Sequence, residues 1–287
     1  PTLNFQGGDV RRLPFNKGFL KYIKNNSKAC IDFAKKDWDS YEISWDFMSL
    51  PLIDFAQEFN SLETTYKNLI KHWRNTVNEM IHLQEEINRF LISFYGLEQE
   101  ITPKVQIDQI TLTCNPSYRY GIKTSKENQE KKLKSDTIKE FISYSVGCMF
   151  GRYSLDKKGL ILANQGETIE DYLKKVPNPK FIPDNDNVIP ILELDWFEDD
   201  ITTRFNEFLR LTFGTENFEN NIRFIENSIG KDIRKYFLND FYKDHVQTYK
   251  KRPIYWMFSS PKGSFNALIY MHRYHKDNLS IILDKYL

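Results

Sequence analysis

The sequence predicts an α+β protein that is predominantly helical, with a long helical connector followed by a mixed α/β region that ends in a β-hairpin and a helix. Three observations predict this class: residues 54–93 contain no proline or glycine, helical periodicity recurs over residues 135–249, and two β-type segments lie near the C-terminus. With 287 residues, 40% of them hydrophobic, the chain is long enough for one large or two modest domains. We expect the connector over residues 1–100 and the mixed region over residues 101–287.

The connector is predicted from the spacing of its apolar residues. Residues 1–50 are rich in aromatic residues and turn signals, which favours loops and short helices. Over residues 54–93, apolar residues recur at steps of three and four, which is typical of one long helix or of two stacked helices. About 40 helical residues span about 60 Å, longer than a compact domain of this size, so we expect a spacer between domains. Gly96 suits a left-handed helix end.

The mixed region is predicted element by element. Alternating, β-branched residues over 105–113 favour a strand, and a flexible polar stretch comes after it. Residues 164–190 contain four prolines and are expected to form a long surface connection with a helical island inside it. Helices are expected over residues 135–150, 168–175, 201–213, 217–228, 232–249 and 277–287. The closing hairpin is expected from strands over residues 254–258 and 265–271 with a turn at 261–264.

Composition excludes several classes of protein. The 40 Lys and Arg residues nearly balance the 39 Asp and Glu residues, so the formal charge of +1 excludes a globally basic nucleic-acid coat. Three scattered cysteines exclude a disulfide framework and, with no Cys-x-x-Cys pair, favour a reducing cytoplasm. No apolar run is long enough to span a bilayer, so no membrane association is expected. The start lacks a methionine and signal-peptide features, and we expect a piece of a longer chain.

Known catalytic patterns are absent from the sequence or incomplete. His272 and His275 lie three residues apart without further ligand types nearby, which favours a surface pair over a metal site. Neither a Gly-x-Ser-x-Gly nucleophile motif nor a glycine-rich phosphate loop is present. The acidic run over residues 193–200 could supply nuclease carboxylates such as Asp195 or Asp199, but without a lysine in the run a solvated face with helix-capping acids is favoured. No catalytic, cofactor-binding or metal-binding residue is therefore predicted in this chain.

A second incomplete pattern is Asn115-Pro116-Ser117-Tyr118. Amino-methylating DNA enzymes hold a flipped adenine with an Asn-Pro-Pro-aromatic loop. The second proline is missing here, and no glycine-rich element for a methyl donor precedes the loop. We therefore interpret these residues as a turn.

A basic stretch over residues 119–134 is the best functional lead from the residues themselves. It holds six cations against two anions, a net charge of +4, in a segment that also contains a tyrosine and a glycine. Cations that neutralise phosphates beside a ring that stacks are typical of DNA contacts. The hairpin turn is a second candidate surface. The candidate DNA contacts are Arg119, Tyr120, Lys123, Lys126, Lys131 and Lys132, with Lys262 and Arg273 on the second surface.

Several long phrases resemble the BREX (bacteriophage exclusion) adenine-specific DNA methyltransferases of the PglX family. They run nearly end to end, and their length makes them more specific than a short motif. The phrases are TLNFQ at 2–6 with GD at 8–9 and LP at 13–14, WDSYEISWDF at 38–47, EINRF at 86–90 with YGLE at 95–98 and TP at 102–103, FISYSVGCMFGRYSLD at 141–156, KRPIYW at 251–256 and FNALIY at 265–270. The first is also similar to the segment C-terminal to the catalytic domain in type IIG restriction-modification enzymes.

The resemblance implies the C-terminal portion of such an enzyme. Family members carry the S-adenosylmethionine site and the Asn-Pro-Pro-Tyr loop in an N-terminal domain ahead of the Asn-Phe-Gln phrase, so this chain is expected to lack that domain and to be inactive alone. The expected role is a connector and a target-recognition region that positions double-stranded DNA and can lie beside other phage-defence subunits. None of the family's catalytic positions falls inside this sequence.

An alternative from another class is a protein-interaction module without DNA contact. Trp38, Tyr41, Trp45 and Phe47 alternate with acidic residues and could form a docking surface for partner subunits or a phage antagonist. Packing of these rings against the long helix is the simpler interpretation.

Overall fold

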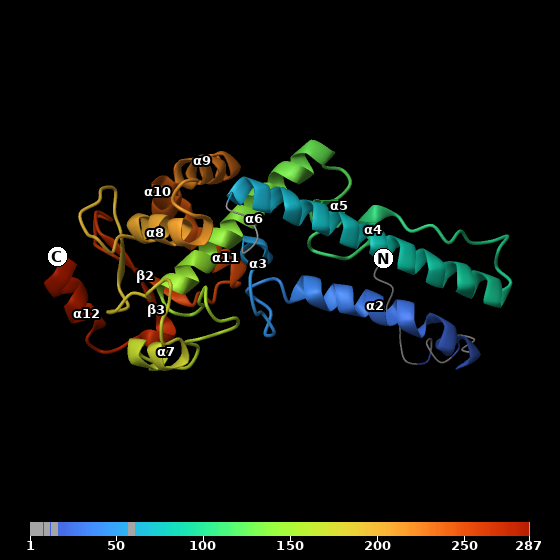
Figure 1. Ribbon diagram of the computed structural model, residues 1–287, viewed down its shortest axis with the longest axis horizontal. Helices are drawn as coiled ribbons and strands as arrows, with labels where there is room; N and C mark the ends of the chain where they lie inside the picture. Colours follow the sequence, from blue (N-terminus) through green and yellow to red (C-terminus); the bar gives the residue numbers. More distant parts are fainter. Residues whose placement is uncertain (1–7, 9–11, 13–16, 57–60, 287) are drawn as a thin grey trace.

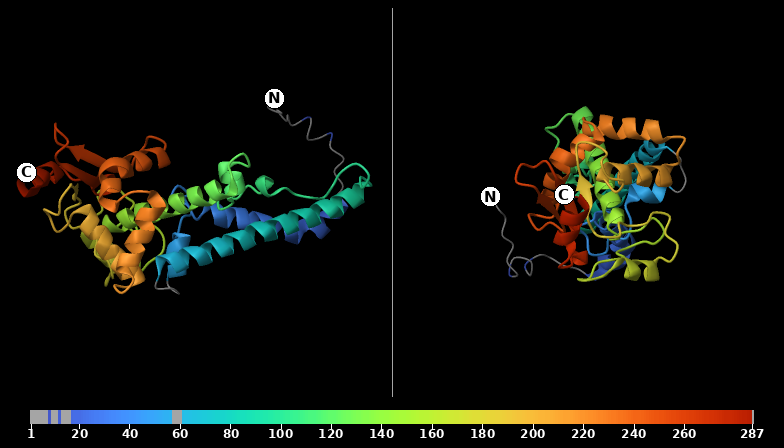
Figure 2. Two further views of the ribbon diagram at one scale, coloured as in Figure 1. Left: turned by 90° about the horizontal axis from the view of Figure 1, so that it is seen from above. Right: turned by 90° about the vertical axis from the view of Figure 1, so that its left-hand side faces the viewer.

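The computed structural model describes residue 8, residue 12 and residues 17–56 and 61–286. Figures 1 and 2 show a globular body at one end and, projecting from it, an arm in which helix α2 (Leu20–Trp38) lies beside helix α4 (Leu62–Tyr95). The described elements are mostly helices with one small sheet, so the predicted α+β, predominantly helical class is confirmed. The domain division near residue 100 stays a prediction.

The arm corresponds to the predicted connector helix. Of the two arrangements left open, the structure has a separate short helix α3 (Pro51–Ala56) before α4, and residues 57–60 lie outside the described part. The 34 residues of α4 span about 51 Å at 1.5 Å per residue. The helix ends at Gly96 in the left-handed conformation, φ 68° and ψ 36°, as predicted.

Helix α2 corrects the expectation of only short helices before residue 50, because it runs for 19 residues after the single turn η1 (Lys17–Phe19). The rest of residues 1–16, including the phrase at 2–6, is outside the described residues apart from Gly8 and Arg12. Aromatic rings join the two helices at the tip of the arm: the centroids of Phe19 and Phe94 are 5.7 Å apart, and those of Tyr22 and Phe90 are 5.1 Å apart.

The prediction of a strand over residues 105–113 is wrong. This segment carries only the turn η2 (Ile107–Gln109), and its apolar residues pack on α4 instead of on a sheet. Side chains satisfy its backbone: the Asp37 carboxylate accepts hydrogen bonds from the amides of Thr113 (2.6 Å) and Cys114 (3.0 Å). The Asn115 amide nitrogen donates to two carbonyl oxygens of the segment, at 2.6 and 2.9 Å. Apolar and polar residues alternate in this segment because one side of it is buried, although the segment is extended without pairing to another strand.

The basic stretch also differs from the prediction, because it is helical rather than flexible. Its residues lie on helix α5 (Pro116–Tyr120), on the following turn and on helix α6 (Lys126–Met149), which begins nine residues earlier than predicted. The Ser125 hydroxyl accepts a hydrogen bond from the Asn128 amide and caps α6. The first turns of α6 are mostly exposed, whereas its last turns are buried in the body.

The remaining helices of the body surround the buried half of α6. Helix α7 (Ile169–Lys175) lies within the predicted range 168–175 and is capped by the Thr168 side chain, and α8 (Ile201–Phe213) and α9 (Phe218–Ile229) match their predicted ranges closely. The helix expected over 232–249 is divided into α10 (Ile233–Tyr236), the π-helical turn η3 (Phe237–Phe241) and α11 (Tyr242–Thr248). After the turn η4 (Met271–Arg273), the last described elements are α12 (Asn278–Ile281) and a second π-helical turn, η5 (Ile282–Tyr286).

The sheet has three antiparallel strands in the order β1-β3-β2. Strands β2 (Tyr255–Ser259) and β3 (Asn266–Tyr270) form the predicted hairpin, with Tyr255 opposite Tyr270. Strand β1 (Ile189–Ile191) was not predicted, because three residues with a central proline carry no alternation signal; it pairs Ile189 with Leu268 at the edge.

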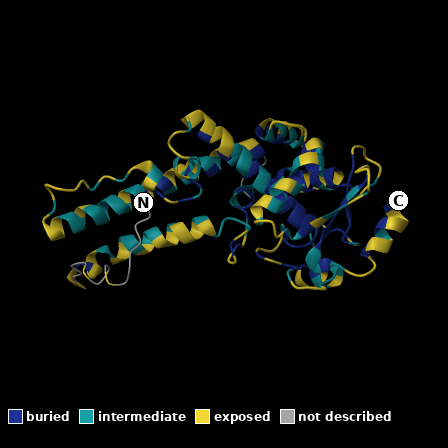
Figure 3. Cartoon of the chain, turned by 180° about the vertical axis from the view of Figure 1, so that it is seen from behind, coloured by how far each residue is buried: buried dark blue, intermediate teal, exposed yellow. Residues whose placement is uncertain are grey.

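The core of the body is rich in aromatic rings. Phe141 of α6 lies 6.1 Å from Phe205 and 5.7 Å from Phe208 of α8, between ring centroids. At Gly147 the helix passes so close to Tyr153 that a Cβ atom there would lie 2.4 Å from the ring. Figure 3 shows buried residues gathered in the body, whereas the arm is mostly half-buried or exposed.

Candidate nucleic-acid interface

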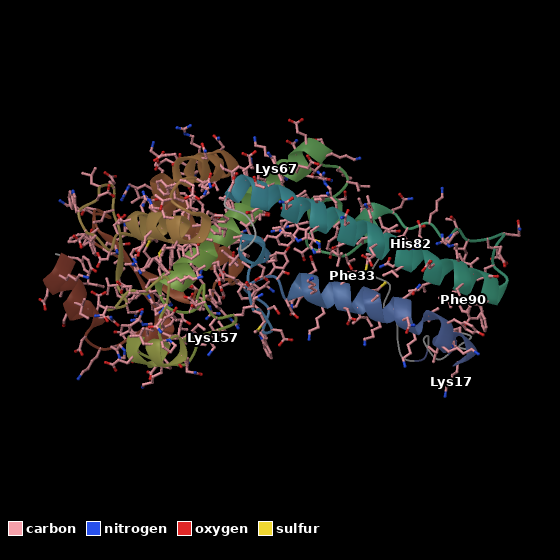
Figure 4. All side chains as sticks on the ribbon, in the orientation of Figure 1. Lys17, Phe33, Lys67, His82, Phe90 and Lys157 are labelled. Carbon is pink, nitrogen blue, oxygen red and sulfur yellow. The ribbon has the colours of Figure 1, made fainter. Side chains whose placement is uncertain are left out.

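A groove of about 1160 Å³ lies between the first half of α4 and the first turns of α6, where the arm joins the body. The segment Cys114 to Ser117 and Leu133 form part of its lining, and Tyr66 and Trp73 add aromatic surface from α4. Lys67 lies near the start of α4, beside the first turns of α6 (Figure 4). We call this feature the basic groove, after the cations that line it from both helices: Lys67, Lys71, Arg74, Lys126, Lys131 and Lys134.

Helical spacing explains why these cations share one groove. Lys67, Lys71 and Arg74 follow one another at steps of four and three along α4, so they lie on one face of the helix. Glu127 and Glu130 are the acidic residues in the lining, which therefore has a net charge of +4. The cations of the predicted basic stretch thus share the groove with a second row of cations, which lies on a helix that was predicted only as a spacer.

Most of these cations are free to bind a ligand. Lys67 pairs with Glu63 (2.7 Å) and Arg74 pairs with Glu130 (2.7 Å), and all four side chains are more than half exposed. Exposed pairs of this kind contribute about 0.2–1 kcal/mol each and exchange readily for another anion. Lys71, Lys126 and Lys131 are exposed and make no ion pair with any residue that the structure describes. The Lys134 ammonium lies 4.3 Å from the centre of the Phe224 ring.

Four of the predicted contacts are exposed on or beside this groove. Lys126 and Lys131 line it, Lys123 lies in the turn before α6, and Lys132 is exposed on α6 with its ammonium 5.9 Å from the Tyr120 ring. These four residues stay candidate contacts. The phenol of Tyr120 is half-buried and donates a hydrogen bond to Asp136 (2.7 Å), so its polar end is already occupied.

Arg119 belongs to a half-buried cluster instead of the groove. Its Nη2 atom lies 3.1 Å from carboxylate oxygens of both Asp136 and Glu140, and its guanidinium lies over the Tyr41 ring. Burial raises the pKa of Glu140 to about 7, and the Arg119 charge opposes that increase. A guanidinium held by two carboxylates is a poor phosphate ligand, so the prediction for this residue is corrected to a structural role.

The second predicted surface does not form as expected. Lys262 is exposed on the hairpin turn, but Arg273 is buried, with 3% of its surface exposed. Its guanidinium donates hydrogen bonds to the carbonyl oxygens of Phe150 (3.3 Å), Asp184 (2.8 Å) and Asn185 (3.0 Å). Arg273 therefore fixes loops of the body, and Lys262 remains as a single exposed cation.

The other motifs have structural roles. The Asn115 side chain caps α5 by accepting from the Ser117 amide (3.2 Å), in agreement with the predicted turn. Asp200 caps α8 and pairs with Arg234 (3.1 Å), and Lys285 lies 2.8 Å from Asp186 and 2.5 Å from Asp199. His272 Nδ1 forms a hydrogen bond with the Tyr270 hydroxyl (2.8 Å). Within the described part of the chain, no group of three or more His, Cys, Asp or Glu side chains could hold a metal ion.

Lys67, Lys71 and Arg74 were not predicted from the sequence. Their spacing on one helical face was readable there, but only the fold shows that this face lies opposite the start of α6.

Across residues 17–56 and 61–286, no helix combines the length and apolar character needed to cross a membrane.

Comparison with known proteins tests the resemblance directly. No model of a known protein family matches the chain. The chain is 36% identical, over an alignment of 301 residues, to the adenine-specific methyltransferase BrxX of Escherichia coli O9:H4 (strain HS), and 35% identical to the adenine-specific methyltransferase PglX of Lacticaseibacillus casei (strain Zhang). Both alignments cover 100% of this chain but only 24% and 23% of the relatives. The resemblance to the PglX family is therefore confirmed, and the chain corresponds to about a quarter of the length of these adenine-specific methyltransferases.

Proposed function

We propose that this chain is the C-terminal, DNA-contacting part of an adenine-specific DNA methyltransferase of a phage-defence system, and that the basic groove holds the phosphate backbone of the duplex. The observation that carries the proposal is the convergence of six cations from α4 and α6 on one groove. The remaining three quarters of the relatives' length would supply the S-adenosylmethionine site and the methyl transfer. In this arrangement the chain positions double-stranded DNA and performs no chemistry itself.

The geometry suits a nucleic-acid backbone. Lys67 and Arg74 are seven residues apart and so about 10 Å apart along the α4 axis, which equals the rise of about three nucleotides along the duplex axis at 3.4 Å each. The cations of α6 face the same space from the other side. Contacts from two helices fix the direction of the backbone, which sets the register of the duplex without reading its sequence.

The test is fluorescence-anisotropy binding of the chain to duplex DNA over a series of salt concentrations. Removing three unpaired cations, as Lys71→Ala, Lys126→Ala and Lys131→Ala together, should weaken binding at least about tenfold and reduce the salt slope by about 0.9 for each phosphate that is no longer neutralised. The matched control removes three exposed lysines elsewhere, Lys157, Lys243 and Lys276. Equal losses of affinity in both triple variants would show non-specific attraction and overturn the groove assignment, as would unchanged binding in the groove variant.

A specific observation also favours the second candidate function, docking of a partner protein. Trp45 is 99% exposed and Trp38 is 54% exposed, with Ile43 (40%) and Met48 (55%) in the same stretch. Exposed tryptophans beside other apolar side chains are typical of protein-interaction hot spots. Phe47 is buried, with its ring centroid 5.3 Å from that of Tyr153, so it belongs to the core of the body and not to this surface.

A further inference from the structure

The two edges of the small sheet differ in their exposure. In the order β1-β3-β2, strands β1 and β2 are the edge strands. All three residues of β1 are buried, and its central Pro190 has no amide hydrogen to donate. In β2, Trp256 is 49% exposed and Ser259 is exposed at the end of the strand. Among the described elements β2 pairs only with β3, so its outer edge is the one at which another strand can be added.

Two hydrogen bonds at the ends of the hairpin show which backbone groups of β2 face β3. The Met271 amide donates to the carbonyl oxygen of Ile254 (3.0 Å), and the Ser260 amide donates to the carbonyl oxygen of Phe265 (2.8 Å). Bonded and non-bonded pairs alternate along an antiparallel ladder. The even-numbered residues of β2 therefore bond to β3, and the odd-numbered residues direct their backbone groups away from it.

Three residues, Tyr255, Met257 and Ser259, thus direct an N–H and a C=O group toward the outer edge. His245 Nε2 accepts from the Tyr255 amide (3.2 Å), so that donor is already occupied. The backbone groups of Met257 and Ser259 bond to none of the described residues. Because buried backbone groups are nearly always paired, these unpaired groups are expected to face solvent. Each of the two residues offers one donor and one acceptor to an added strand.

The segment that carries this edge is strongly basic. Residues 250–276 hold six cations and no acidic residue. Arg273 is buried, but the other five cations are exposed and form no ion pair with any described residue: Lys250, Lys251, Arg252, Lys262 and Lys276. Three of them come shortly before β2, and Lys262 lies on the turn after it. A strand paired with β2 therefore meets positive charge near both of its ends.

The backbone fixes the lysines before β2 in place. Lys250 and Lys251 both have left-handed conformations, with φ angles of 50° and 64°, which are unfavourable for residues with a Cβ atom. The Lys250 amide donates to the carbonyl oxygen of Gln247 (3.1 Å), and the Lys251 amide donates to that of Val246 (2.8 Å). These bonds to the last turn of α11 hold the two charged residues next to the start of the strand.

We propose that the outer edge of β2 binds an extended acidic peptide segment of another protein, which adds a fourth strand to the sheet. The peptide backbone bonds to Met257 and Ser259, and an apolar side chain of the peptide packs on the Trp256 ring. Its acidic residues lie near the cations before and after β2. A second copy of this chain does not fit, because antiparallel pairing of two β2 strands brings the cations before one strand close to the turn of the other. The edge shares no residue with the basic groove and is independent of the proposed DNA contact.

The test is fluorescence anisotropy of labelled peptides titrated with the whole chain. A peptide of alternating valine and threonine with acidic residues at both ends should bind with a dissociation constant of about 0.1 mM. A second peptide has lysines at its ends, and a third keeps the acidic ends but carries N-methyl groups on its central amides, which block pairing along either edge. Each of these two should bind at least about tenfold more weakly.

Two results with the peptides overturn the proposal. Equal binding of the N-methylated peptide shows attraction by charge alone, without an added strand. No binding of the first peptide at millimolar concentration shows that the cations keep this edge free of other strands.

A variant pair locates the binding. Ser259→Pro removes an outward amide that β3 does not use and should weaken binding of the acidic peptide at least about tenfold. Ser259→Ala keeps the amide and should bind as the unaltered chain does. Unchanged binding in Ser259→Pro overturns the assignment. If that variant does not fold, amide hydrogen exchange in the unaltered chain decides, because the peptide must slow exchange at Met257 or Ser259, and unchanged exchange at both places the peptide elsewhere.

Nucleic acid is the other class of ligand that exposed cations beside a tryptophan attract. Replacing the three cations before β2 with glutamine should weaken binding of the acidic peptide at least about tenfold. Its affinity for duplex DNA should stay within about twofold of that of a control variant with three exposed lysines of the arm replaced in the same way. The control lysines are Lys17, Lys24 and Lys28. A loss of DNA affinity well beyond that of the control, with unchanged peptide binding, assigns this surface to nucleic acid and overturns the proposal.

Discussion

The arm and the body use similar residues in different ways. Helix α2 has no buried residue and contacts the rest of the chain along one face, whereas α8 buries six of its 13 residues among the helices and sheet of the body. One-sided packing leaves the outer faces of the arm free to carry charge, and the body has almost no such freedom. The basic groove lies where these two kinds of packing meet.

The largest expected effect comes from the core of the body. Phe205→Ala removes a fully buried ring that contacts Phe141 and Phe237, and should lower the free energy of unfolding by about 3–5 kcal/mol. Phe90→Ala at the tip of the arm removes a half-buried ring and should cost about 1 kcal/mol. Urea unfolding of both variants measures the contrast. Equal losses of stability would show that the arm is packed as fully as the body.

The next largest effect distinguishes the half-buried ion pair of Arg119 from the exposed ion pair of Lys67. Arg119→Ala leaves the half-buried Glu140 without its cation and should destabilise the fold by about 2–3 kcal/mol. Lys67→Ala breaks an exposed pair with Glu63 and should cost less than about 0.5 kcal/mol, yet it should weaken DNA binding. Thermal unfolding and anisotropy measured on both variants distinguish stability from binding. A stable Arg119→Ala variant would contradict the structural role assigned to this cluster.

A smaller effect is expected from pH. Burial raises the pKa of Glu42 to about 7, from an ordinary value near 4.5. The stabilising contribution of a group with a raised pKa is fully present below its unfolded value and is lost as the pH rises through the folded value. Glu42→Gln removes this loss, so its stability relative to the unaltered chain should increase by up to about 2 kcal/mol between pH 5.5 and pH 8. Urea unfolding at the two pH values measures it, and a pH-independent difference would contradict the raised pKa.

Sequence patterns predicted the fold where local signals and packing agree. The periodicity of α8 and α9 and the pairing of the hairpin depend on residues near one another in the chain. The strand expected at 105–113 failed because Asp37, about 75 positions earlier, satisfies its backbone, and no local signal carries that information. Strand β1 could not be predicted from the sequence for a similar reason, since only its pairing with β3 makes it a strand.

The residues of the candidate site also differ in how far local sequence could predict their roles. Lys123, Lys126, Lys131 and Lys132 could be chosen from charge density alone, because exposed lysines need no partner. Arg119 and Arg273 could not be told from them, since a buried guanidinium is distinguished only by the carboxylates or carbonyls that the fold brings to it. Arginine is the more common choice for such buried roles, and this preference would have favoured the lysines as the surface contacts.

The smallest effect on stability is expected in the exposed segment between α2 and α3. Trp45 is almost fully exposed, so Trp45→Ala should change the free energy of unfolding by less than about 0.5 kcal/mol. If this ring anchors a partner protein, the same change should weaken that complex at least about tenfold while DNA binding stays unchanged. Under the proposed phage-defence function, the measurement is a pull-down of individually purified subunits of such a system, with the unaltered chain and the variant side by side. Trp196→Ala, at a tryptophan outside this stretch that is 70% exposed, is the matched control for loss of apolar surface alone. Retention of every partner by the Trp45→Ala variant would leave the basic groove as the functional surface and remove the docking function, because no other large apolar side chain in this stretch is as exposed.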